Sequence, residues 1–236
     1  MVKPPDYVLE HVSKRIAGEI ILSDNPGSAI RKWREIYGLN QYELCRLMNV
    51  NPSVLSDYER GRRLPGRRFI KRFIEALFKH DSRNEWSVTI EVAKLLNIYV
   101  EGVIDLGEFK NPVQLGELVS IVEGIPLTTI THHRPIKGYT ILDSVKSVQA
   151  LTANEYVKAL GSTSDRVVVF TNITRGRSVL VAVRVSPVKP SCIILHGVRK
   201  IDPLAIRIAI LEEIPLIQSL ISIDEMIGRV RRLALI

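Results

Sequence analysis

Two short helix signals separated by a tight turn constrain this chain more than any other feature of its sequence. The first begins at Asn40, which can cap a helix because Glu43 follows three residues later, and it predicts a helix over Gln41–Met48. The second begins at Asn51, a good capping residue before a proline, and it predicts a helix over Pro52–Arg60. Two helices joined in this way form a helix-turn-helix.

Four further helices are expected around this pair. Apolar residues at helical spacing predict an amphipathic helix over Asp6–Leu22, and Asn25 with the following proline starts another that runs to about Tyr37. The stretch "RRLPGRR" indicates a loop. Apolar periodicity then predicts helices over Arg67–Phe78 and, from a weaker pattern, over Glu85–Asn97.

The positive charge of the chain is concentrated in the same stretch. Between Ser28 and His80 there are twelve Lys/Arg and five Asp/Glu, which gives +7 of the formal net charge of +8 for all 236 residues. This asymmetry indicates a polyanion-binding module joined to a nearly neutral one. The alternative is that the basic residues only solvate a helical surface.

Beyond residue 125 the pattern changes to short apolar runs rich in β-branched residues. "RVVVF", "SCIIL" and "IPLIQS" predict buried parallel strands, "DPLAIRIAILEE" and "SIDEMIGRVRRL" predict helices, and "TRGRSVLVAVRV" could be either. Such alternation predicts an α/β domain with a mainly parallel sheet. Upstream, "IYVEGVIDLGEFKNP" indicates irregular structure or a short strand, and a helix is expected over Pro112–Glu123.

These patterns divide the chain into four segments and predict an α + α/β fold class. Residues 1–24 are expected to form the N-terminal amphipathic helix, and residues 25–98 an all-α helix-turn-helix domain that binds DNA. Residues 99–135 are expected to connect it to a small α/β domain at 136–236, which would support dimerisation or sense a ligand.

The stretch "AIRKWREIYGLNQYELCRLMNVNPSVLSDYERGRRLP" resembles the Cro/repressor-like (XRE-type) helix-turn-helix family of transcription regulators. The matching pieces are "GLNQYEL", "NVN", "YERGRRLP" and the apolar frame, in order and over roughly Ala29 to Leu77. The resemblance implies binding to double-stranded DNA, with the second helix of the pair in the major groove.

The resemblance also implies roles for single residues. Gln41 would grip a phosphate at a helix N-terminus, where free N–H groups favour an anion. Arg34 and Glu59 would form a structural brace between two helices. The positions that face the bases, with one close to them, are Pro52, Ser53, Ser56 and Asp57.

Two of these positions depart from what the family often carries. Pro52 offers no donor, and Asp57 can only accept from a cytosine amino group or repel phosphate, so direct readout is expected to be thin. Arginines after the second helix would compensate by neutralising phosphates, two or three of them touching DNA, or one entering a minor groove. The alternative is that they solvate helix ends. These arginines are Arg60, Arg62, Arg63, Arg67 and Arg68.

The C-terminal domain offers a possible ligand cleft. Side chains that follow two predicted parallel strands meet at the carboxyl edge of a sheet, where ligands of α/β proteins bind, so an anionic small-molecule effector could bind there. The alternative is that these loops only connect elements. The residues are Thr171, Asn172, Thr174, Arg175, His196 and Asp202.

The stretch from "KPSCIILHGVRK" to "SIDEMIGRVRRL" resembles the DRTGG-type domain in its order of strand, loop, helix, "IPLI" strand and helix. The DRTGG signature itself is replaced by "HGVRK", so the resemblance concerns the fold. With its helix-turn-helix, the whole chain resembles an archaeal-type transcription regulator.

Other function classes find little support in the sequence. Cys45 and Cys192 have no metal-ligand spacing, and the adjacent His132 and His133 indicate a solvated loop, so neither a disulfide framework nor a metal site is expected. No apolar run approaches the roughly 20 residues that span a bilayer, and the N-terminal stretch "MVKPPDYVLEHVSKR" lacks the apolar centre of a secretory signal, so none is expected. A cytoplasmic protein without a cofactor and without a catalytic constellation is therefore expected.

The favoured hypothesis is a sequence-specific DNA-binding transcription regulator. A homodimer is expected because two half-sites one helical turn apart multiply specificity, with either Asp6–Leu22 or the C-terminal domain as its interface. Two alternatives stay open. One is an α/β enzyme or ligand-binding protein with an accessory helical domain, and the other is an antitoxin-like module that uses its helices for protein contacts.

Overall fold

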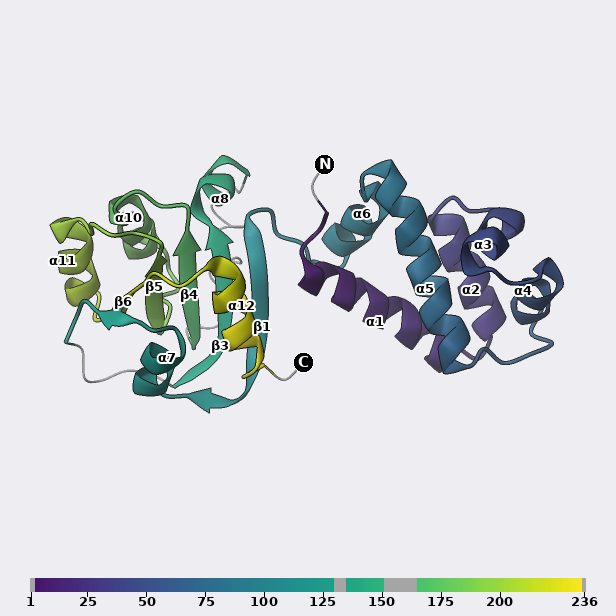
Figure 1. Ribbon diagram of the computed structural model, residues 1–236, viewed down its shortest axis with the longest axis horizontal. Coiled ribbons are helices and arrows are strands. Elements are labelled where there is room, and N and C mark those ends of the chain that lie inside the picture. Colours follow the sequence, from purple (N-terminus) through teal and green to yellow (C-terminus); the bar gives the residue numbers. More distant parts are fainter. Residues whose placement is uncertain (1–2, 130–134, 151–164, 235–236) are drawn as a thin grey trace. The chain divides into compact units, whose positions relative to one another are not determined.

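The chain divides into two compact units, Met1–Tyr99 and Val100–Ile236 (Figure 1). The computed structural model describes residues 3–129, 135–150 and 165–234. In these ranges no helix combines the length and the apolar character needed to cross a membrane. We call the first unit the helical unit and the second the α/β unit, and each is described by itself.

The helical unit follows the sequence prediction closely. α1 and α3 have the predicted bounds, α4 ends one residue early, and α5 runs three residues further, to Asp81. The elements are α1 (Asp6–Leu22), α2 (Pro26–Ile36), α3 (Gln41–Met48), α4 (Pro52–Glu59), α5 (Arg67–Asp81), the 3₁₀ turn η1 (Ser82–Asn84) and α6 (Ser87–Leu95).

A buried carboxylate joins the end of α5 to the start of α6. Asp81 is fully buried and accepts hydrogen bonds from the backbone N–H of Val88 at 3.2 Å and of Thr89 at 2.7 Å. The Thr89 hydroxyl also donates to Asp81 at 2.6 Å and lies 3.2 Å from the hydroxyl of Tyr37. The carboxylate thus satisfies N–H groups that the first turn of α6 leaves unpaired.

The α/β unit contains one six-stranded sheet of order β1-β3-β4-β5-β6-β2. The four central strands are parallel, and β1 and β2 pair antiparallel at the two edges. The elements are β1 (Val103–Val113), α7 (Leu115–Ile121), β2 (Ile125–Pro126), β3 (Ile136–Asp143), α8 (Ser144–Ala150), β4 (Arg166–Thr171), α10 (Arg177–Val185), β5 (Cys192–His196), α11 (Pro203–Leu211), β6 (Leu216–Ser219) and α12 (Ile223–Arg231).

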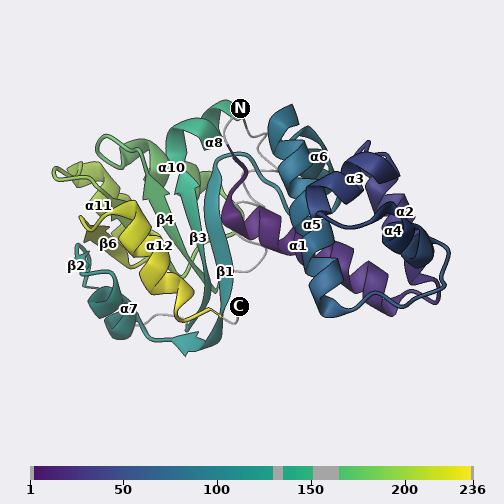
Figure 2. The ribbon, with the colours of Figure 1, turned by 45° about the vertical axis from the view of Figure 1, so that its right-hand side comes forward.

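Helices cover both faces of this sheet. α7 and α12 lie on one face, where Leu118 and Met226 pack on alternate strand residues such as Val167 and Ile194, and α8, α10 and α11 lie on the other (Figures 1 and 2). The parallel strands advance in one direction from β3 to β6, so right-handed crossovers place the described connecting helices α8, α10 and α11 on the same face. This confirms the predicted α/β domain with a mainly parallel sheet.

The structure corrects the predictions for the residues before the parallel strands. The stretch expected to be irregular or to hold a short strand is the eleven-residue strand β1, and no strand was predicted at β3, its partner. Because Val113 still pairs with Ile136, α7 begins at Leu115 rather than at Pro112. β1, α7 and β2 lie within residues 99–135, the expected connecting region. The ambiguous segment "TRGRSVLVAVRV" forms helix α10.

A buried charge cluster fastens α12 to the edge strand β1. Asp105 is 1% exposed and accepts hydrogen bonds from the Tyr139 hydroxyl at 2.9 Å and from Nε and Nη2 of Arg231 at 2.9 and 2.8 Å. The hydrogen bond to Asp105 raises the pKa of Arg231, and burial raises the pKa of Tyr139, so the arginine is charged and the phenol neutral. The cluster sets the position of α12.

Candidate nucleic-acid interface

The α3–turn–α4 pair has the local structure that its capping residues predict. Asn40 and Glu43 form the reciprocal capping box at the start of α3, and the Asn51 side chain accepts from the N–H of Ser53 at 3.1 Å to cap α4. Asn49 ends α3 in the left-handed region at φ 49°. The turn between the helices is therefore fixed by short polar side chains.

A buried ion pair holds α4 against α2, as the family resemblance implies. Glu59 accepts from Nε of Arg34 at 2.6 Å and from its Nη2 at 3.1 Å, while Nη1 of Arg34 donates to the carbonyl of Leu39 at 2.8 Å. Both charged side chains are at least nine-tenths buried. A paired and fully hydrogen-bonded arrangement is the condition under which buried charges are tolerated, so the pair acts as the brace of α4.

Gln41 is part of this brace. Its amide nitrogen donates to Glu59 at 2.6 Å. Its side chain therefore lies toward α4, whereas the sequence predicts a contact with a phosphate. The backbone N–H groups of Gln41 and Tyr42, in the first turn of α3, donate to no acceptor among the described residues. They are therefore available to bind an anion.

Two residues to which the sequence analysis gave no role also position the α3–turn–α4 pair. A Cβ on Gly27 would lie 2.3 Å from the carbonyl oxygen of Tyr58, so only glycine allows α2 to approach the end of α4 this closely. Nη2 of Arg72 on α5 donates to the carbonyls of Met48 and Asn49 at the end of α3. A glycine and an arginine on separate helices give no local sequence signal, because both contacts are tertiary.

The outer face of α4 carries short polar side chains. Pro52 and Ser53 are exposed, and Ser56 and Asp57 are partly exposed. The Ser53 hydroxyl donates to the side chain of Asn51 at 3.0 Å, which leaves its oxygen able to accept. The structure thus brings the three predicted base-facing residues, and Ser56 beside them, to one accessible face of a short helix.

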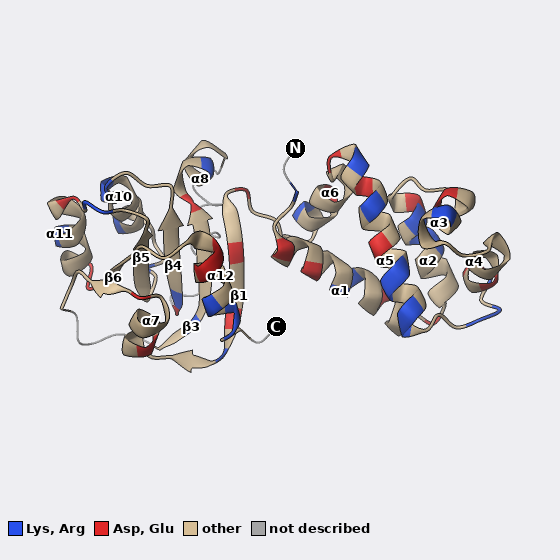
Figure 3. Ribbon diagram, in the orientation of Figure 1, with Lys and Arg blue, Asp and Glu red and all other residues tan. Residues whose placement is uncertain are grey.

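The predicted phosphate-binding arginines surround this face. Arg62 and Arg63 make long contacts of 3.4 and 3.8 Å with Asp57, whereas Arg60, Arg67 and Arg68 have no ion pair with any described residue. All five are exposed, on α5 and on the loop that follows α4 (Figure 3). A hollow of about 670 Å³ lies between α4 and α5 and is lined by residues that include Arg67, Arg68 and Arg72.

Aromatic packing keeps this basic segment against the fold. The ring centroids of Tyr58, near the end of α4, and Phe69, on α5, lie 4.1 Å apart. Phe69 stacks in turn with Phe73, with 6.3 Å between the ring centroids. Such pairs stabilise beyond their buried area. The loop between α4 and α5 is therefore held at both ends.

The six residues of the predicted ligand cleft mostly make contacts within the chain. Thr171 donates to the carbonyl of Leu142, Asn172 donates to Asp143 at 2.9 Å, and His196 Nε2 lies 2.7 Å from the carbonyl of Ile221. Strand order does not reverse between β3 and β6, so these strands form no switch-point crevice. His132 and His133 lie outside the described residues.

Asp202, another residue of that predicted cleft, caps a helix. It accepts from the N–H of Leu204 at 2.9 Å and pairs with Arg177, and the Leu204 hydrogen bond, followed by Arg177, lowers the pKa of the carboxyl. Thr174 and Arg175 are the two members of the set whose exposed side chains have no hydrogen-bond or ion-pair partner among the described residues.

Comparison with known proteins agrees with this geometry. The Helix-turn-helix family profile matches residues 30–81. A protein of Archaeoglobus fulgidus is 40% identical over 223 residues, which cover 94% of this chain and 96% of the relative, and one of Methanocaldococcus jannaschii is 37% identical over 231 residues, which cover 95% of each. Both are named HTH-type transcriptional regulators.

One solved structure is similar to part of the chain. It contains the CBS and DRTGG domains of the regulatory region of Clostridium perfringens pyrophosphatase with its activator, diadenosine tetraphosphate. The two are 12% identical, the match covers 51% of this chain and 47% of that one, and the TM-score is 0.38. A score of this size establishes no common fold.

Proposed function

This chain belongs to the family of HTH-type transcriptional regulators and is a DNA-binding transcription regulator, and we propose that it docks on duplex DNA with α4 in the major groove. The observation that carries this proposal is the surface around α4. Short polar side chains of the helix face outward, and exposed arginines without strong partners flank them.

The proposal divides affinity from sequence preference. Arginines bind phosphates regardless of sequence. Log affinity falls as log salt rises, and each phosphate contact makes this negative slope steeper by about one. Ser53 and Ser56 can each make one modest base contact, and Pro52 makes none through hydrogen bonds. A regulator built in this way binds strongly at low salt and discriminates weakly through a single copy of α4.

Two copies of α4 would restore discrimination. A homodimer presents two recognition helices to half-sites about one helical turn apart, and base contacts then add over both half-sites. The α/β unit has a core of its own, which suits it to hold the dimer together. Regulation by a small anionic effector would be left to the exposed Thr174 and Arg175.

Selection of bound sequences from random duplex DNA tests the proposed role of α4. The native chain should enrich one motif, and Ser53→Ala should change the base preference at one or two of its positions while leaving the others unchanged. Ser87→Ala, an exposed serine on α6, is the matched control and should enrich the native motif. An unchanged motif for Ser53→Ala would remove this residue from the readout.

A further inference from the structure

α12 turns one face to the sheet and the opposite face outward. Met226 and Val230 are fully buried against the sheet. Asp224, Gly228 and Arg232 are exposed and follow one another at intervals of four residues. This spacing places the three on one stripe along the outside of the helix.

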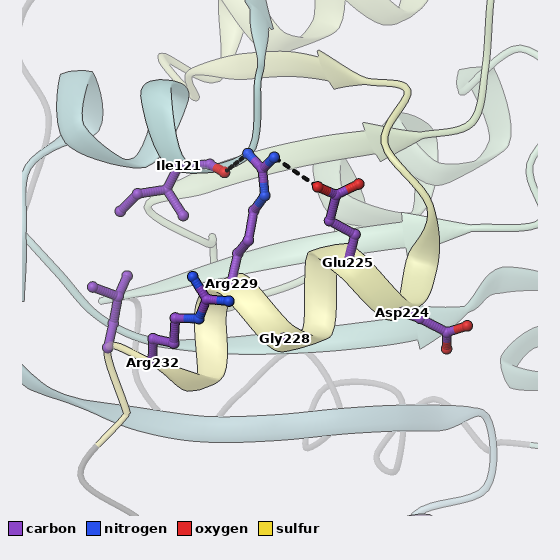
Figure 4. Close-up of a pocket in the computed structure, with 7 residues that line it drawn as sticks. Ile121, Asp224, Glu225, Gly228, Arg229 and Arg232 are labelled. Carbon is purple, nitrogen blue, oxygen red and sulfur yellow. Dashed lines mark hydrogen bonds and ion pairs between the residues drawn. The ribbon is translucent and has the colours of Figure 1, made fainter.

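An open hollow of about 620 Å³ lies over this stripe, with Ile121 of α7 on its other side (Figure 4). Arg229 also lines it, but its guanidinium donates to the carbonyl of Ile121 at 2.8 Å, to Glu123 at 2.5 Å and to Glu225 at 2.7 Å. These partners balance the Arg229 charge within the chain. The hollow is therefore not a binding site for a free anion at this arginine.

Gly228 lies in the interior of α12, where neither the backbone conformation nor a contact within the described chain requires a glycine. It is not among the glycines with positive φ, and a Cβ added there would meet no described atom within 4 Å. Glycine is unfavourable inside a helix compared with alanine. A glycine at an exposed position does, however, allow another backbone to approach closely.

The charges on either side of Gly228 are opposite and unsatisfied. Figure 4 shows Asp224 and Arg232 at the two ends of α12, and neither forms an ion pair with any residue in the described part of the chain. Each lies four residues from Gly228. Rotation by 180° about an axis through Gly228 therefore brings the acidic end of one α12 to the basic end of another, twice.

We propose that α12 is the dimerisation helix, and that its partner is a second copy of this chain packed antiparallel to it with Gly228 at the crossing point. Such a contact is isologous, and each Asp224 lies against Arg232 of the partner subunit. A stable interface buries roughly 800 Å² on each partner, so the contact extends from α12 onto the neighbouring α7. The proposal deepens the dimeric part of the proposed function, and its test needs no DNA.

Cross-linking of the full chain at the proposed axis tests the geometry. A disulfide requires Cα atoms within about 7 Å, which Gly228→Cys satisfies only if two copies cross there. The native cysteines, Cys45 and Cys192, are both buried. Ser178→Cys on α10 is the matched control, because Ser178 is exposed and α10 lies on the other face of the sheet. Under mild oxidation, Gly228→Cys should form a covalent dimer at least tenfold faster than Ser178→Cys, and equal rates would overturn the proposal.

A charge exchange tests the pairing. In sedimentation equilibrium of the full chain, Asp224→Arg should weaken the dimer at least tenfold, and the double change Asp224→Arg with Arg232→Asp should restore it. Both variants place an unfavourable charge at a helix end, so restoration separates dimer contact from helix stability. A native chain that sediments as a monomer overturns the proposal. So does a dimer that tolerates Asp224→Arg but is lost on Leu211→Ser, at an exposed apolar position of α11.

Discussion

Two groups of arginines, one in each unit of this protein, have opposite environments. In the α/β unit, Arg231 and Arg229 each make several hydrogen bonds to carboxylates or carbonyls of the same chain. In the helical unit, Arg60, Arg67 and Arg68 are exposed and have no ion-pair partner among the described residues. The difference indicates that arginines of the first kind hold the fold, whereas those of the second kind are available to an external polyanion.

The helical unit also contains arginines of the first kind, and the carboxylate partner of one of them, Arg34, gives the largest expected effect. Glu59→Ala removes the bidentate partner of the buried Arg34, which keeps only a 3.5 Å contact with the more exposed Glu35, and it should lower the free energy of unfolding of the helical unit by about 3–5 kcal/mol. Both tryptophans, Trp33 and Trp86, lie in this unit, so tryptophan fluorescence during urea unfolding reports on it alone. Glu75→Ala, at an exposed position on α5, should change it by less than about 0.5 kcal/mol. Equal stability of the two variants would contradict the brace.

Removal of the buried carboxylate Asp105 in the α/β unit should lower the free energy of unfolding by somewhat less than Glu59→Ala does in the helical unit. Asp105→Ala removes the acceptor of Tyr139 and Arg231, and it should cost about 2–4 kcal/mol because the partly exposed arginine can still reach water. Hydrogen exchange should show faster opening of α12 amides, and the tryptophan signal of the helical unit should not change. Unaltered exchange in α12 would show that the cluster does not hold this helix.

Close backbone contact distinguishes two glycines of the helical unit. Gly27→Ala places a Cβ against the carbonyl of Tyr58 and should destabilise by about 1–3 kcal/mol. Gly18→Ala on α1 meets no described atom within 4 Å and should stabilise by up to about 1 kcal/mol. Thermal unfolding of both variants checks the opposite signs, and a stabilising Gly27→Ala would contradict the α2–α4 geometry.

The smallest expected effect concerns Asp57, which makes long contacts with Arg62 and Arg63. Asp57→Asn removes a negative charge near Arg62 and Arg63 and from the proposed DNA-facing surface, so affinity for any duplex should rise by up to about fivefold at low salt. Fluorescence anisotropy with two unrelated duplexes measures it. A loss of affinity for one duplex only would instead make Asp57 a base-contacting residue.

The sequence predicts the helical unit better than the sheet, and the reason is the range of the interactions. Capping residues and proline act within one turn, so α3 and α4 could be placed to within a residue. β3 was missed because Gly138 interrupts its apolar pattern. The structure gives the reason for this glycine, since a Cβ there would lie 2.7 Å from the carbonyl oxygen of Gly107 on β1. Asp105 and Arg231 meet across 126 positions, which no local pattern can indicate.

The predicted interface was placed from local signals and from the family resemblance, but its details depend on tertiary contacts. The amide of Gln41 donates to Glu59. Arg72 supports the end of α3 and Gly27 the end of α4, in both cases without any recognisable spacing. In the predicted ligand cleft, Asn172 and Asp202 are engaged by their own chain, because residues at a strand end serve as often to connect elements as to bind a ligand.

The salt dependence of DNA binding tests the central claim most directly. Arg63→Ala with Arg67→Ala should make the negative slope of log affinity against log salt shallower by about 1.8, since each lost phosphate contact removes about 0.9 from its magnitude. The matched double variant, Arg175→Ala with Arg199→Ala, removes two exposed arginines of the α/β unit and should leave the slope at its native value. The same slope for the native chain and the Arg63/Arg67 variant would contradict DNA docking through the α4–α5 surface.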